Sequence, residues 1–92
     1  REGEYRSMRF LESLGYHCVR SAGSHTPVDI VADSATESLR IQVKVGAKPP
    51  AKEHQRLLDW ETPPGVRKFM HHWVKEGREW RLNAVELAPV AR

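Results

Sequence analysis

The chain has 92 residues, with 15 Lys and Arg against 12 Asp and Glu, which gives a formal net charge of +3 at pH 7. Hydrophobic residues make up 39% and charged residues 29%, a balance that argues against intrinsic disorder. The apolar runs are far shorter than the ~18 residues that span a bilayer, so no membrane partner is expected. The length predicts one domain, residues 1–92, and the single cysteine, Cys18, excludes an intrachain disulfide and fits the reducing cytoplasm.

The spacing of apolar residues predicts both helices and strands along the chain. Gly15 is a natural helix stop, and Pro-Pro pairs at 49–50 and 63–64 bracket a short middle segment. The expected elements are a helix at 2–14, strands at 16–20, 28–33 and 39–45, a helix at 51–60, and strands at 69–74 and 80–87. This order predicts an α/β fold with a central mixed sheet of about five strands flanked by helices.

Glu4 lies at the edge of the apolar face of the first predicted helix. The face is formed by Tyr5, Met8, Leu11 and Leu14, which recur at helical spacing. From spacing alone, we favour a carboxylate that interacts with the helix dipole in the first turn. The alternative is an acid directed toward the sheet.

A short link joins the second and third predicted strands, which favours an antiparallel hairpin. The third strand alternates apolar and polar residues, so its two faces are distinct. If Asp33 pairs with Ser38 at the turn, then Asp29 stands directly opposite Gln42 on the polar face. Their Cβ atoms would be about 5 Å apart. A one-residue slip would turn the apolar side chains outward, so this register is preferred.

The predicted register gathers a carboxylate, an amide oxygen and an ammonium group on one patch of the sheet. Asp29 and Gln42 offer side-chain oxygens, and the Val43 carbonyl offers a third. Oxygen atoms are the ligands that Mg²⁺ prefers, and Mg²⁺ offsets charge on a phosphate. Lys44, two residues beyond Gln42, would orient the attacking water or offset developing charge. The alternative is a set of polar strand residues that merely face solvent.

Three segments resemble the archaeal Holliday junction resolvase family, which belongs to the PD-(D/E)XK nuclease superfamily. They are GYHCVRSAGS at 15–24, PVDIVA at 27–32 and IQVKV at 41–45. The resemblance extends more loosely over residues 3–88. It implies a restriction-endonuclease-like core and a homodimer that hydrolyses phosphodiester bonds in branched DNA with Mg²⁺, for which Mn²⁺ would substitute. No small-molecule cofactor is expected.

The resemblance also implies roles for individual residues. Asp29 resembles the metal-binding aspartate, Lys44 the catalytic lysine, and Glu4 the helix acid that completes the metal site. Ser24 resembles a loop serine that contacts the scissile region. The predicted catalytic residues are Glu4, Ser24, Asp29, Gln42 and Lys44, and the predicted metal ligands are Glu4, Asp29, Gln42 and Val43.

Two positions depart from the resolvase pattern. Gln42 stands where the family has Glu, which keeps one oxygen ligand but loses a charge, and Tyr5 stands where resolvases usually have Arg. Gln at the first of these positions also occurs in Mrr-type restriction endonucleases of the same superfamily. Two alternatives therefore stay open: an Mrr-like or phage-type nuclease that acts on other DNA structures, and a catalytically decayed DNA-binding homologue.

Basic residues near the predicted site are candidates for DNA contacts, although simple solvated charge explains each of them equally well. The predicted DNA-binding residues are Arg20, Ser24, His25, Lys48, Lys52 and Arg56. Among the other polar groups, His71 and His72 are adjacent on a strand and point to opposite faces, so they cannot chelate one ion. We expect the three tryptophans in the core or in a dimer interface rather than in stacking on bases.

Overall fold

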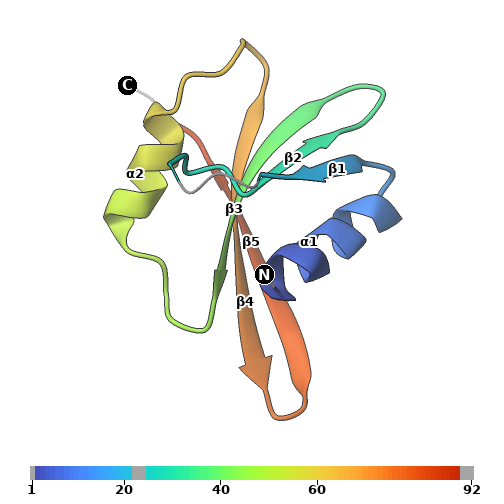
Figure 1. Ribbon diagram of the computed structural model, residues 1–92. Helices are drawn as coiled ribbons and strands as arrows, with labels where there is room; N and C mark the ends of the chain where they lie inside the picture. The colour runs from blue at the N-terminus through green and yellow to red at the C-terminus, as the bar shows by residue number, and fades with distance from the viewer. Residues whose placement is uncertain (1, 22–24, 90–92) are drawn as a thin grey trace.

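The computed structural model describes residues 2–21 and 25–89, and the predicted order of elements is confirmed (Figure 1). The elements are α1 (Glu2–Ser13), β1 (His17–Arg20), β2 (Ile30–Asp33), β3 (Ser38–Val45), α2 (Ala51–Asp59), β4 (Arg67–Glu76) and β5 (Glu79–Leu87). Neither helix in this part of the chain has the length and apolar character that crossing a membrane requires.

The strands form one mixed sheet in the order β1-β2-β3-β4-β5. Three neighbouring pairs are antiparallel, and β3 and β4 are parallel. A parallel pair needs a long crossover, and α2 supplies it between β3 and β4. The two helices lie on opposite sides of the sheet (Figure 1). The predicted α/β fold with a central mixed sheet is confirmed.

The core lies between α1 and the first three strands. Its buried residues are Leu11 of α1, Ile30 and Ala32 of β2, and Leu39 and Ile41 of β3. The buried positions on β3 alternate with partly exposed Arg40 and Gln42, as the period of a strand requires. The predicted β2–β3 register is confirmed for residues 30–33, because Asp33 pairs with Ser38 and Ile30 with Ile41, whereas the predicted pair of Asp29 with Gln42 lies outside the ladder.

Gly3 lets the first turn of α1 lie directly against β3. A Cβ atom at this position would clash with Cγ2 of Val45 and would lie 3.1 Å from Cγ1 of Val43. A side chain here would push the helix away from the sheet. Glycine therefore sets how closely the neighbouring Glu4 approaches the strands.

A buried polar network joins α1 to β4. Ser7 is fully buried, and its Oγ accepts a hydrogen bond from Nε1 of Trp73 at 2.8 Å. The same oxygen lies 2.9 Å from Nδ1 of His71, which is only 2% exposed. Burial lowers the pKa of His71 to about 4, so the ring is neutral at pH 7.

The remaining histidine and tryptophan predictions have mixed outcomes. His71 and His72 do face opposite sides, since His71 packs under α1 and His72 contacts the Gly46 carbonyl oxygen at 2.7 Å. Trp73 is in the core as predicted. Trp60 lies outside the core, because α2 ends at Asp59 and leaves the indole 38% exposed, and its place in a dimer interface stays a prediction.

Candidate active site

Asp29 lies just before β2, where its side chain completes the pairing with β3. Its N–H donates to the Ile41 carbonyl oxygen at 2.8 Å, and its Oδ2 accepts from the Val43 N–H at 2.8 Å. The predicted strand 28–33 was therefore too long: β2 begins at Ile30, because at Asp29 a carboxylate takes the place of a backbone acceptor. Since Val43 lies between Gln42 and Lys44, this bond fixes the carboxylate beside both residues.

Asp29 is partly buried and has an unfavourable electrostatic environment for a carboxylate. Burial raises its pKa, and the negative charges of Glu4 and Glu53 raise it further, while the hydrogen bond from Val43 opposes the shift. A bound cation would relieve this cost. Glu53 was not singled out from the sequence, although an acid three residues beyond Pro50 in the first turn of α2 is a visible signal.

Gln42 presents an acceptor that has no partner. Its Oε1 is buried and makes no hydrogen bond to the described residues. A buried acceptor left unsatisfied costs about 1–3 kcal/mol. Oxygen donors from Asp29 and Gln42 therefore suit a hard cation such as Mg²⁺, which also retains several waters.

Glu4 forms an ion pair with Arg20, so its role is not limited to a favourable interaction with the helix dipole. Nη1 of Arg20 lies 3.1 Å from its Oε1, and both side chains are partly buried. The guanidinium of Arg20 also lies over the ring of Tyr5, at 5.3 Å from the centroid. These contacts bring a predicted DNA-binding residue, Arg20, against a predicted metal ligand. They engage Oε1 and leave the second carboxylate oxygen of Glu4 for another ligand.

The predicted metal ligands include only two carboxylates, those of Glu4 and Asp29. Across residues 2–21 and 25–89, no three His, Cys, Asp or Glu side chains come together as a metal-binding group. A cation at this site would thus depend on the Gln42 amide as well as on Glu4 and Asp29. The Val43 N–H is used by Asp29, and the proposed role of the Val43 carbonyl stays a prediction.

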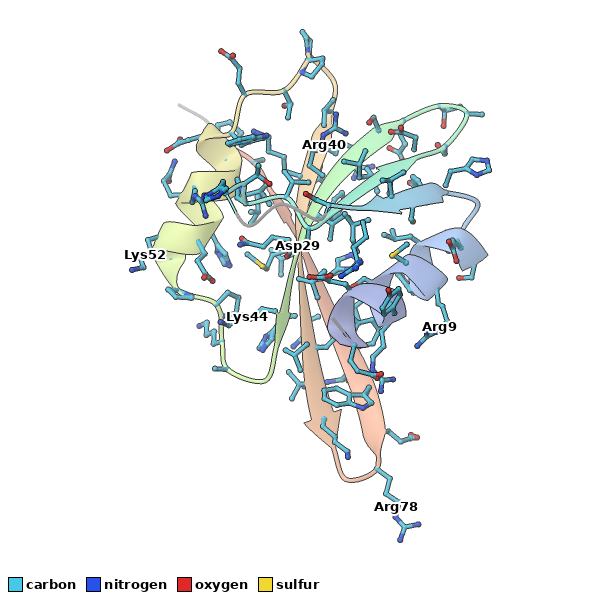
Figure 2. All side chains as sticks on the ribbon, in the orientation of Figure 1. Arg9, Asp29, Arg40, Lys44, Lys52 and Arg78 are labelled. Carbon is cyan, nitrogen blue, oxygen red and sulfur yellow. The ribbon has the colours of Figure 1, made fainter. Side chains whose placement is uncertain are left out.

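Lys44 is partly buried near the end of β3, on the same strand face as Gln42. Figure 2 shows it on the α2 side of the sheet, with Asp29 near the middle of the molecule. Its ammonium group has no hydrogen bond or ion pair with the part of the chain that the structure describes. In register it pairs with His72 of β4. An unengaged cation at this position is available for an anionic ligand.

Other predicted DNA-binding residues lie on and around α2. Lys48, Lys52 and Arg56 are exposed, and Lys52 and Arg56 lie one helical turn apart. Nη2 of Arg56 donates to the carbonyl oxygen of His25 at 2.9 Å, which ties that loop residue to the helix. Ser24 lies outside the described residues.

Comparison with solved structures identifies a similar fold in Hjc, a Holliday junction resolvase from the archaeal hyperthermophile Archaeoglobus fulgidus. The sequences are 26% identical, the TM-score is 0.66, and the match covers 88% of this chain and 68% of that chain. No protein-family model matches the sequence, and a search of curated proteins found no relative. The resemblance to archaeal resolvases is thus confirmed at the level of structure, and the fold is the restriction-endonuclease-like fold of that resolvase.

Proposed function

We propose that this protein is a metal-dependent endodeoxyribonuclease that cleaves branched DNA, with the four-way junction as its preferred substrate. The similarity to an archaeal resolvase supports this function. The observation that carries it is the bond between Asp29 and the Val43 N–H, which holds a carboxylate against the part of β3 that also carries Gln42 and Lys44.

The oxygen donors fit a divalent cation. Asp29, just before β2, and Gln42 of β3 would hold it, and Glu4 would add the oxygen that Arg20 leaves free. A bound Mg²⁺ or Mn²⁺ supplies positive charge for the phosphate and lowers the pKa of water. The raised pKa of Asp29 and the orphaned Gln42 oxygen are the features that a cation would satisfy.

The chain's own cations act on the DNA. Lys44 binds a non-bridging oxygen of the scissile phosphate and offsets the charge that develops there. Arg20 holds the carboxylate of Glu4 at the edge of the site. Lys48, Lys52 and Arg56 contact the backbone on either side of the cleaved bond. Because a junction presents two equivalent strands, a homodimer would supply two such sites.

The test of this function is cleavage of a synthetic four-way junction beside linear duplex of the same sequence, with and without Mg²⁺. We expect cleavage of the junction only with the metal, and Lys44→Ala should reduce its rate by about 10²–10³-fold. Junction binding in Ca²⁺ should remain detectable. Arg81→Ala removes an exposed arginine that is paired with Glu76 on the β4–β5 hairpin, and it serves as the control. Undiminished cleavage by Lys44→Ala would exclude this catalytic role.

A catalytically decayed DNA-binding protein is the second candidate, because Gln42 supplies one charge fewer than a carboxylate. Gln42→Glu separates the two. If the nuclease proposal is right, the wild type cuts, and the variant reaches half-maximal rate at a lower Mg²⁺ concentration, since a second carboxylate strengthens the site. A wild type that is inert in both Mg²⁺ and Mn²⁺, with a Gln42→Glu variant that cuts, favours decay. Flap and single-stranded substrates in the same assay test the Mrr-like alternative.

A further inference from the structure

A second basic surface lies between α1 and the β4–β5 hairpin, outside the candidate active site. A cavity of about 430 Å³ opens there, lined by Arg6, Arg9, Trp73, Arg78, Glu79 and Trp80. Three guanidinium groups therefore accompany one carboxylate. Figure 2 shows Arg9 on the outer side of α1 and Arg78 at the end of the hairpin, away from Lys44 and Lys52 on the α2 side. We define the hairpin surface as Arg6, Arg9, Lys75 and Arg78.

Trp80 holds two cations of this surface in place. Cζ of Arg6 lies 4.8 Å from the centroid of the indole ring, and Nζ of Lys75 lies 5.9 Å from it. Lys75 and Trp80 are a cross-strand pair, whereas Arg6 comes from α1. Cation–π contacts of this kind are worth about 0.5–1 kcal/mol at exposed sites. They order the two side chains without neutralising them.

The hairpin surface also lacks the carboxylate partners that other arginines have. Arg67 pairs with Glu37 and Glu86, and Arg81 pairs with Glu76 at 3.1 Å. Within the described residues, Arg9 and Arg78 have no ion pair. The contact of Arg6 with Glu2 is long, at 3.9 Å, and Glu2 is 78% exposed. Such a contact contributes little.

The distance between this surface and the active site determines how long a ligand must be to contact both. Lys44 pairs in register with His72, and β4 runs from there to the turn at Gly77 and Arg78. Because Glu76 pairs with Glu79, Arg78 lies level with Gly77, five residues beyond His72, and at about 3.4 Å per residue it lies roughly 17 Å from Lys44 along the strand. That distance corresponds to roughly five base pairs of duplex, at 3.4 Å per pair.

We propose that the hairpin surface binds the phosphate backbone of a DNA arm about five base pairs from the cleaved bond. This inference rests on the proposed nuclease function, since it assigns a second contact to the same substrate. Arginine matches phosphate because its planar guanidinium donates two parallel hydrogen bonds. Four cations spread over α1, β4 and the turn that follows β4 suit an extended polyanion rather than a small anion.

The test compares two variants that remove equal charge from the same hairpin region. Arg78→Gln removes an unpaired arginine, and Arg81→Gln removes one that is already paired with Glu76. Arg9→Gln/Arg78→Gln removes two unpaired arginines. Binding of a labelled four-way junction is measured in Ca²⁺ at several salt concentrations. We expect the slope of log K against log salt to become shallower by about 0.9 in Arg78→Gln and about 1.8 in the double variant.

The length of the junction arms provides an independent readout. With arms of four base pairs, the wild type and the double variant should bind equally, because the DNA ends before the hairpin surface. With long arms, the maximal cleavage rate at saturating junction should be unchanged in the double variant. Equal effects of Arg78→Gln and Arg81→Gln, or an effect independent of arm length, would overturn the inference. A wild type that cuts while the double variant binds normally overturns only this inference, whereas absence of DNA binding by the wild type overturns the nuclease proposal as well.

Discussion

Replacing Asp29 by Asn is expected to abolish Mg²⁺-dependent cleavage and to raise the melting temperature of the metal-free protein by a few degrees. The amide oxygen can still accept from the Val43 N–H, so the local backbone should keep its arrangement. The variant loses the charge that a cation needs. It also loses a partly buried charge near Glu4 and Glu53, whose ionisation opposes folding.

The stability gain depends on pH in a defined direction. Burial raises the pKa of Asp29 in the folded state above the value of about 3.9 for an unfolded aspartate. The folded state therefore keeps its proton to a higher pH, and stability falls as pH rises through this interval. The advantage of Asp29→Asn should disappear below about pH 4 and should grow as pH rises above that value.

Thermal unfolding with and without Mg²⁺ checks this prediction. Mg²⁺ at ten times its dissociation constant should stabilise the wild type by about 1.4 kcal/mol and should leave Asp29→Asn unchanged. Asp33→Asn, which alters an exposed carboxylate at the β2–β3 turn, is the control and should keep the response to Mg²⁺. A melting temperature lower than that of the wild type would show that the ionised carboxylate does not destabilise the fold.

The sheet register could be predicted because two local signals agree. The alternation along β3 leaves only one face for the core, and the short link fixes the pairing of Asp33 with Ser38. That pairing places Asp29 next to the segment of β3 that carries Gln42 and Lys44, because Ile30 pairs with Ile41. The position of Asp29 outside β2 could not be predicted, because a carboxylate that replaces a backbone acceptor leaves the alternation of the sequence unchanged.

The hydrophobic periodicity of the sequence could not predict the contacts between distant segments. The ion pair of Glu4 with Arg20 depends on how α1 crosses β1, and Gly3 decides how closely the helix approaches. The electrostatic influence of Glu53 on Asp29 depends on where the crossover places α2. Helical and strand patterns specify which face is apolar, but they do not specify which polar side chains meet across two elements.

Replacing Ser7 by Ala is expected to cause the largest loss of stability. The change removes the acceptor for the Trp73 indole N–H and the hydrogen-bond partner of His71, both of which are buried. Each buried polar group left unsatisfied costs about 1–3 kcal/mol. For the two groups together, a total of about 2–6 kcal/mol corresponds to a fall of at least about 8 °C in a domain of this size.

Ser13→Ala in the same helix is the matched control. The Ser13 hydroxyl donates to the Phe10 carbonyl oxygen at 2.6 Å but is exposed, so its loss leaves no buried group unpaired. Adding Trp73→Phe to Ser7→Ala removes one orphaned donor, and the double variant should be less destabilised than the sum of the single changes. Strict additivity would mean that the network contributes no coupling.

Acidification should destabilise the protein through the same buried network. Burial lowers the pKa of His71 to about 4, below its unfolded value of about 6.5, so the unfolded state binds more protons in this interval. Stability should be complete above pH 6.5 and should fall by about 2–3 kcal/mol as pH drops to about 4. The fall should be smaller in His71→Gln.

The contact between Ser7 and His71 joins α1 to β4, so its loss should also displace Glu4 of α1. Cleavage by Ser7→Ala should therefore need a higher Mg²⁺ concentration than cleavage by the wild type. Cleavage by Ser13→Ala should not.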